Sequence, residues 1–169
     1  MVKIILAAFA LAVFSSAASA QTPAELLEKF EGHWTSSGPA FGGAAESAMT
    51  WAPALNGKFV RLDYRVAVAR DDGGTFVFVG VAHYQRGDNE VLSAYWADNS
   101  GDLHPIRAER DGDALVSHWG VEGGKQGRTR YALFPAGEMQ VTDWIKTDDG
   151  WRQFNQNVFA KVLAGEAAE

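Results

Sequence analysis

The sequence has 169 residues, a formal net charge of −6 and no cysteine. Nucleic acids and anionic membrane surfaces are bound through clustered Lys and Arg, so the acidic balance argues against both partners. A chain without cysteine has no disulfides, so burial of apolar surface and a closed hydrogen-bond ladder must stabilise it. The length is that of one domain with a substantial core.

Residues 1–20 have the pattern of a cleaved signal peptide. Lys3 precedes an apolar run from Ile4 to Phe14, and the small residues Ala18-Ser19-Ala20 follow. The run is far shorter than the about 20 residues that a transmembrane helix needs, and a lipid anchor would require a cysteine. We therefore expect a periplasmic or secreted protein with no stable membrane anchor, a single domain over residues 21–163 and a disordered tail over 164–169.

The first predicted element is a short helix from Thr22 to Phe30. Thr22 can cap it, Pro23 suits its first turn, and Glu25 completes a capping box. Its apolar stripe needs a partner to bury against, and Gly32 then stops the helix. We expect this helix to plug one end of a barrel.

After Gly32 the apolar period changes to two residues, which indicates β-strands. From Lys58 to Arg70 the even positions are apolar, whereas Thr75 to Gln85 is apolar on both faces, which predicts a strand covered on both sides. Further alternating runs begin near Glu90, Asp102, Asp113, Gln126, Glu138 and Gly150, with shorter ones around Trp34 and Met49. The count is about ten strands.

Turns rich in Gly, Asn and Asp separate these runs, as at Asn56-Gly57, Gly87-Asp88-Asn89 and Asp111-Gly112. No gap is long enough for a crossover helix, so the strands must be antiparallel neighbours. Closure into an up-and-down barrel hides every strand edge. The predicted fold is therefore all-β, an antiparallel up-and-down barrel with a short N-terminal helix; a two-sheet sandwich is the alternative.

The helix leading into Gly32-His33-Trp34 resembles the Gly-x-Trp signature of calycins, the superfamily of lipocalins, fatty-acid-binding proteins and nitrobindins. The resemblance implies that Trp34 closes one barrel end beneath an arginine of the final strands, for which Arg152 and Arg130 are candidates. The chain is also similar to a bacterial family of secreted domains without an agreed activity. That similarity rests on Met49-Thr50-Trp51, the turn 55–59, Gly80–Tyr84, Tyr95–Asp98 and Gly101.

Nitrobindins bind haem through a histidine near the last strands. The four histidines of this chain are His33, His83, His104 and His118, and none follows Trp119. The haem ligand therefore does not carry over, and a haem-binding barrel of nitrobindin type remains an alternative only.

Other catalytic and metal signatures are weak. The chain has no His-x-His or Glu-x-x-His pair, and its serines lack a Gly-x-Ser-x-Gly elbow. We expect structural or surface histidines, no metal site and no cofactor. Arg61 shares a strand face with Arg65, and Arg128 with Arg130, so each pair could bind an anion if it faced the cavity. The apolar positions of these strands form the better inward set, so we expect the arginines to make ion pairs on the surface.

Six tryptophans are many for one small domain and indicate a cavity for an amphiphilic molecule. Barrels of this size have room for one small ligand. Binding of a small hydrophobic or amphipathic molecule is therefore favoured over catalysis. The candidate ligand-binding residues are Trp34, Tyr64, Phe78, Tyr84, Trp96 and His118. The enzyme alternative is proton transfer within the cavity, by His118 with Asp98 or Asp143. The sequence does not define the oligomeric state.

Overall fold

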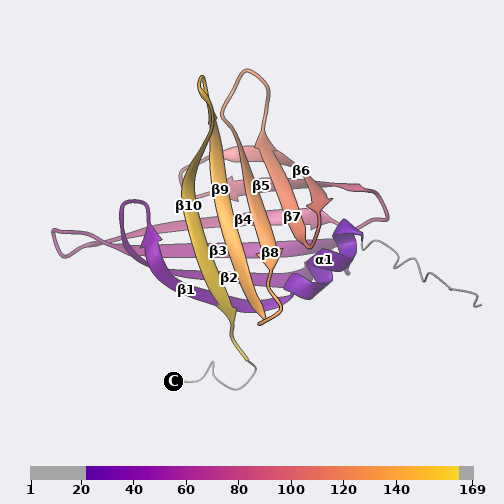
Figure 1. Cartoon of the computed structure of the whole chain (residues 1–169), viewed down its shortest axis with the longest axis horizontal. Helices are drawn as coiled ribbons and strands as arrows, with labels where there is room; N and C mark the ends of the chain where they lie inside the picture. Colours follow the sequence, from indigo (N-terminus) through magenta and orange to yellow (C-terminus); the bar gives the residue numbers. More distant parts are fainter. Residues whose placement is uncertain (1–21, 164–169) are drawn as a thin grey trace, which may run out of the picture.

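Ten antiparallel strands form a closed up-and-down barrel in the computed structural model, which describes residues 22–163 (Figure 1). The elements are α1 (Pro23–Phe30), β1 (Gly32–Ala40), β2 (Gly43–Ala54), β3 (Phe59–Ala69), β4 (Thr75–Gln85), β5 (Val91–Asp98), β6 (Leu103–Asp111), β7 (Ala114–Gly120), β8 (Gln126–Leu133), β9 (Glu138–Thr147) and β10 (Gly150–Lys161). The predicted fold class is confirmed. The predicted signal peptide and C-terminal tail lie outside the described residues.

Helix α1 covers one end of the barrel, where it packs against β5, β6 and β7 (Figure 1). The predicted capping box is present, because the Thr22 hydroxyl accepts from the Glu25 N–H at 3.2 Å and the Glu25 carboxylate accepts from the Thr22 N–H at 2.7 Å. So short a helix is not stable in water by itself, and burial of Leu26, Leu27 and Phe30 sustains it. No helix among residues 22–163 is long and apolar enough to cross a membrane.

Trp34 is buried beside α1, where its indole N–H donates to the Phe30 carbonyl at 2.7 Å. The cation over its ring is Lys161 of β10, 5.1 Å from the ring centroid. This corrects the expectation that Arg152 or Arg130 takes that place. Gly32 makes the arrangement possible, because its φ is +128° and a Cβ there would lie 2.7 Å from Lys161 Cε.

The inward and outward strand faces follow the predicted alternation. On β3 the even positions Val60, Leu62, Val66 and Val68 are buried, whereas Arg61 and Asp63 form an exposed ion pair on the outer face. The prediction that β4 is covered on both faces is wrong. Its second apolar face lies outside the barrel, where Val79 is 38% exposed, because no element packs over it.

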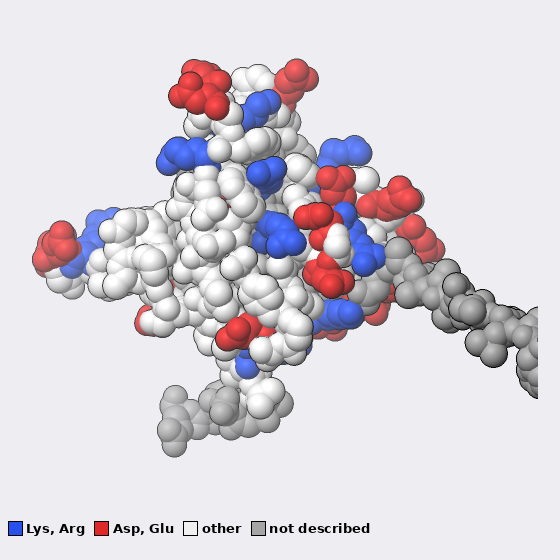
Figure 2. Space-filling model, in the orientation of Figure 1, with Lys and Arg blue, Asp and Glu red and all other residues white. Residues whose placement is uncertain are grey.

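The barrel end opposite α1 is open. It carries the loops that join β1 to β2, β3 to β4, β5 to β6, β7 to β8 and β9 to β10. Strand β4 pairs with β5 only from Gly80 onward, and the β1–β10 seam consists of Trp34 opposite Lys161 and Thr35 opposite Ala160. The outer halves of β1–β4 therefore project beyond the barrel as a curved flange, at the left of Figure 1. Its inner face is apolar, formed by Ala40, Ala45, Val66 and Val68. Its sides are largely uncharged in Figure 2, while charged side chains gather near α1.

Candidate functional site

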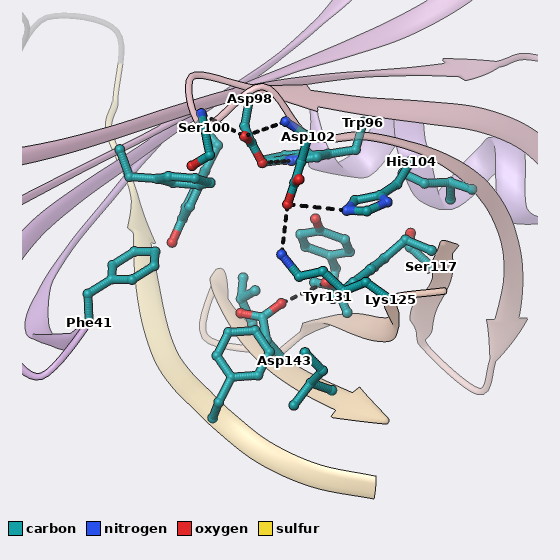
Figure 3. Close-up of a pocket in the computed structure, with 18 of the residues that line it drawn as sticks. Phe41, Trp96, Asp98, Ser100, Asp102, His104, Ser117, Lys125, Tyr131 and Asp143 are labelled. Carbon is teal, nitrogen blue, oxygen red and sulfur yellow. Dashed lines mark hydrogen bonds and ion pairs between the residues drawn. The ribbon is translucent and has the colours of Figure 1, made fainter. Parts of the chain in front are cut away.

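A cavity of about 450 Å³ lies inside the barrel between the closed end and the open end (Figure 3). Four residues selected from the sequence line it: Tyr64, Phe78, Tyr84 and Trp96. A volume of this size accommodates one small organic molecule. Below the cavity, Trp51 packs its ring against Phe30, Tyr84 and Tyr131 at centroid distances of 5.2–5.5 Å and separates the cavity from α1.

Two indoles lie flat on the cavity wall because the strand beneath each of them carries a glycine. A Cβ at Gly80 would lie 2.0 Å from the Trp96 ring, and one at Gly127 would lie 1.9 Å from the Trp119 ring. Neither glycine has a positive φ, so both are required for close approach rather than for backbone conformation. Together they keep two large rings out of the cavity space.

Trp96 is held on three sides. Its indole N–H donates to Asp98 Oδ2 at 2.9 Å, its ring stacks on Phe78 at 6.2 Å, and Tyr64 packs against it at 6.2 Å. On the neighbouring strands β6 and β7, the His104 and Trp119 rings lie 5.3 Å apart. The ring faces are therefore fixed before any ligand arrives, which lowers the entropic cost of binding.

Three tyrosines form the inner polar part of the cavity. The Tyr84 hydroxyl lies 3.0 Å from the Ser117 hydroxyl and also shares a hydrogen bond with Tyr131, while Tyr64 bonds to Ser47. Burial raises the pKa of Tyr84 to about 12, and burial likewise raises the pKa values of Tyr64 and Tyr131. All three are therefore neutral hydrogen-bonding groups at physiological pH.

Asp143 of β9 lies deep in the barrel and faces this cavity. Its Oδ1 accepts from the Thr129 hydroxyl at 2.6 Å, and its Oδ2 accepts from Asn155 Nδ2 at 2.8 Å. Burial raises the pKa of Asp143, and these two hydrogen bonds offset part of that rise. None of the ion pairs between the described residues involves Asp143.

A β-bulge positions the partner of Asp143. The β9–β10 register shifts between Gln153 and Asn155, so Phe154 is the additional residue and Asn155 lies opposite Asp143. Asn157 then donates to Asn155 Oδ1 at 2.9 Å. Because a bulge changes the direction of the side chains that follow it, both amides point into the barrel and hold the carboxyl in place.

The mouth of the cavity is charged, and three of its groups are paired with one another. Lys125 Nζ lies 2.7 Å from Asp102 Oδ2, and His104 Nε2 lies 3.6 Å from the same oxygen (Figure 3). The Lys125 ammonium, with a smaller contribution from His104, holds the pKa of Asp102 below its ordinary value.

Phe41 lies in the β1–β2 turn at the edge of the mouth (Figure 3). Its φ of +48° is unusual for a residue with a bulky side chain, and its ring is 56% exposed. The ring contacts Phe76 at 5.8 Å and Phe78 at 5.2 Å. The aromatic wall thus extends from the cavity onto the flange.

Two sequence-selected residues lie elsewhere. Trp34 is part of the closed end and does not line the cavity. His118 is on the outer face of β7, 43% exposed, with Nε2 3.2 Å from Glu109 Oε1. It therefore meets neither Asp98 nor Asp143, and the predicted proton-transfer group does not assemble around it.

The structure adds Trp119 and Tyr131 to the site, which sequence reasoning did not select, and it also places there Asp143, which the sequence named only in the enzyme alternative. Asp143 had a recognisable signal, because it occupies an inward position between Val141 and Ile145 on an otherwise apolar strand face. Trp119 is in the inward phase of β7, one residue after His118.

Arg128, Arg130, Trp144 and Trp151 do not line the cavity, whereas Arg152 does. Arg128 is on the outer face, with its guanidinium 4.6 Å from the Trp144 ring centroid and 4.9 Å from that of Trp151, and Arg130 pairs with Asp111 at 3.3 Å. Among the described residues, no group of three or more His, Cys, Asp or Glu side chains gathers as a metal site.

Comparison of the chain with protein-family models gave no match, and comparison with curated proteins gave none either. The calycin likeness is therefore one of architecture, a closed antiparallel ten-strand barrel with a helix at one end.

Proposed function

We propose that this chain is an exported, calycin-like binding protein that holds one small amphipathic molecule in its barrel cavity. The observation that carries the proposal is the cavity of about 450 Å³, with fixed aromatic walls and a few polar groups at its inner end. Ring-lined cavities gain affinity from buried apolar ligand surface, at about 25 cal/mol per Å², and a few polar groups orient the ligand.

Export to the periplasm or medium is part of the proposal, and the pattern of residues 1–20 supports it. Haem is not the ligand that this site favours. His33, His83 and His118 lie on the outer face, and the ring of His104 lies at the mouth. The polar groups of the inner cavity are therefore tyrosines and Asp143. These groups suit hydrogen bonding to an organic ligand.

The first test uses the uncharged fluorescent probe N-phenyl-1-naphthylamine with a variant that fills the cavity. Gly80→Ala places a Cβ where the Trp96 ring now lies, so the indole must move into the cavity. We expect saturable one-to-one binding by the wild type and a loss of at least about tenfold in Gly80→Ala, which is about 1.4 kcal/mol.

Gly87→Ala is the matched control, because its Cβ would meet only Asn89 Nδ2, at an ordinary contact distance of 3.7 Å. It should bind the probe like the wild type. If the wild type shows no saturable binding, or if a folded Gly80→Ala binds as tightly as the wild type, the proposed function is wrong.

A further inference from the structure

The inner end of the cavity combines one carboxyl group with five aromatic rings and contains no cation of its own. Asp143 receives only neutral donors, the Thr129 hydroxyl and the Asn155 amide. A carboxylate oxygen accepts two hydrogen bonds, so each oxygen of Asp143 retains a free acceptor position. A partly buried carboxylate without a charged partner carries a desolvation cost, and a cation on the ligand would relieve that cost.

The electrostatic field of Asp143 extends through the cavity. After burial itself, the charge of Asp143 is a further cause that raises the pKa of Tyr64, Tyr84 and Tyr131. A potential that opposes a phenolate at these positions favours a positive charge in the space between them. The field would act in the opposite direction on a carboxylate ligand.

The rings add a second attraction for a cation. Trp96 of β5 and Trp119 of β7 line the wall on either side of His104 of β6, and Tyr64, Tyr84 and Tyr131 surround the inner end. The faces of aromatic rings carry partial negative charge, and several rings around one site bind ammonium groups through cation–π attraction. The same rings cover the apolar part of a ligand.

Among the described residues, neither cation that lines the mouth, Lys125 or Arg152, forms an ion pair with Asp143. Lys125 is paired with Asp102 at 2.7 Å, while Asp98 receives the Trp96 indole N–H and the backbone N–H of Ser100. The mouth therefore presents two carboxylates, Asp98 and Asp102, beside the paired Lys125. Arg152 of β10 also lines it.

We propose that the ligand is an amphipathic organic amine whose ammonium group binds the Asp143 carboxylate and whose apolar part lies against Trp96 and Trp119. This inference rests on the proposed binding function and names the chemical class of its ligand. The inner carboxyl selects for charge, in the order cation, neutral molecule, anion. The ring walls accept any apolar part that the cavity volume admits.

The test compares ligands that share one frame and differ in charge. Tryptamine is a cation at pH 7.5, tryptophol is neutral and indole-3-acetate is an anion; octylamine, octanol and octanoate repeat the series on a flexible chain. Affinities are measured by calorimetry and by displacement of N-phenyl-1-naphthylamine. In at least one series we expect the amine to bind the wild type about tenfold or more tightly than the alcohol, with the carboxylate weakest.

Asp143→Asn keeps the shape of the side chain and removes its charge. We expect it to reduce amine affinity to that of the alcohol while alcohol affinity changes by less than about threefold. Asp148→Asn removes the same charge from the exposed β9–β10 turn and should retain the preference for the amine. The inference would be overturned if Asp143→Asn and Asp148→Asn lost the preference for the amine equally, or if Asp143→Asn retained it.

A measurement on the wild type does not depend on any variant folding. The carbon-13 signal of the Asp143 carboxyl, followed against pH, should show that saturating tryptamine or octylamine lowers the pKa of Asp143, whereas the alcohols leave it unchanged. If the uncharged probe binds but neither amine is preferred, this inference alone fails. If no probe or ligand binds, the proposed function fails with it.

Discussion

At the scale of single residues, the cavity exists because of what certain positions lack. Gly80 and Gly127 have no side chain, so two indoles lie against the strands instead of filling the interior. Asp143 lacks an ion-pair partner among the described residues, although its inward position between Val141 and Ile145 suits an apolar side chain better. Such departures from local rules are typical of functional sites.

Asp143 should make the stability of the protein depend on pH in a defined direction. Its folded-state pKa is raised by burial, so the folded protein binds the proton more tightly than the unfolded chain. The stabilisation from this group is fully present below its unfolded-state pKa of about 3.9. It is lost as the pH rises through the folded-state pKa.

We therefore expect Asp143→Asn to be more stable than the wild type at pH 8 and to show a smaller difference near pH 4. Urea unfolding across this range measures it. The other titratable groups that face the cavity are present in both proteins: Tyr64, Tyr84, Tyr131, Asp98, Asp102, His104, Lys125 and Arg152. A wild-type advantage that grows with pH would contradict the prediction.

At the scale of elements, α1 and the start of β1 act as one closing unit. Trp34 connects them through its hydrogen bond to the Phe30 carbonyl and lies beneath Lys161 of the last strand. Arg86 at the end of β4 adds ion pairs to Glu28, at 3.5 Å, and to Glu31. The first and last strands and the helix therefore depend on a single indole.

Trp34→Ala should destabilise the protein by about 3 to 5 kcal/mol, because it removes a large buried side chain and leaves a cavity. Chemical unfolding measures the change. Trp151→Ala is the matched control, since this indole is 43% exposed and away from the closing unit, and its effect should be much smaller. Equal losses in the two variants would show that Trp34 has no special role in closure.

The elements were predictable from sequence because their causes are local. Alternation from Val60 to Val68 and the capping box at Thr22 and Glu25 each depend on a few neighbouring residues. The cation over Trp34 was not predictable, because it depends on the register that places Lys161 opposite Trp34 across the seam. His118 was selected although the adjacent Trp119 is in the inward phase, and only the register of β7 distinguishes them.

At the scale of the whole molecule, the barrel is closed by its shortest ladder. The β1–β10 register comprises two residue pairs, whereas β1 and β2 pair along the full length of β1. Beyond Thr35 the two strands diverge, and Asn157 reaches across to the Pro39 carbonyl at 3.4 Å. The divergence widens the mouth next to the flange, so access to the cavity and weakness of the seam have the same geometric origin.

A disulfide across this seam should therefore stabilise the protein more than one across an ordinary hairpin. Thr35 and Ala160 are opposite each other on exposed positions, and opposed antiparallel residues have Cα atoms about 4.5–5.5 Å apart, within disulfide range. The Thr35→Cys/Ala160→Cys crosslink closes a loop of more than about 100 residues, for which chain entropy predicts about 4.7 kcal/mol.

Ala48→Cys/Arg65→Cys, across β2–β3, closes a loop near 15 residues and should give about 3 kcal/mol. The chain has no other cysteine to compete. Unfolding of each variant, oxidised and reduced, measures the difference; a seam disulfide that fails to form, or that stabilises less than the hairpin one, would contradict the closure described for β1 and β10.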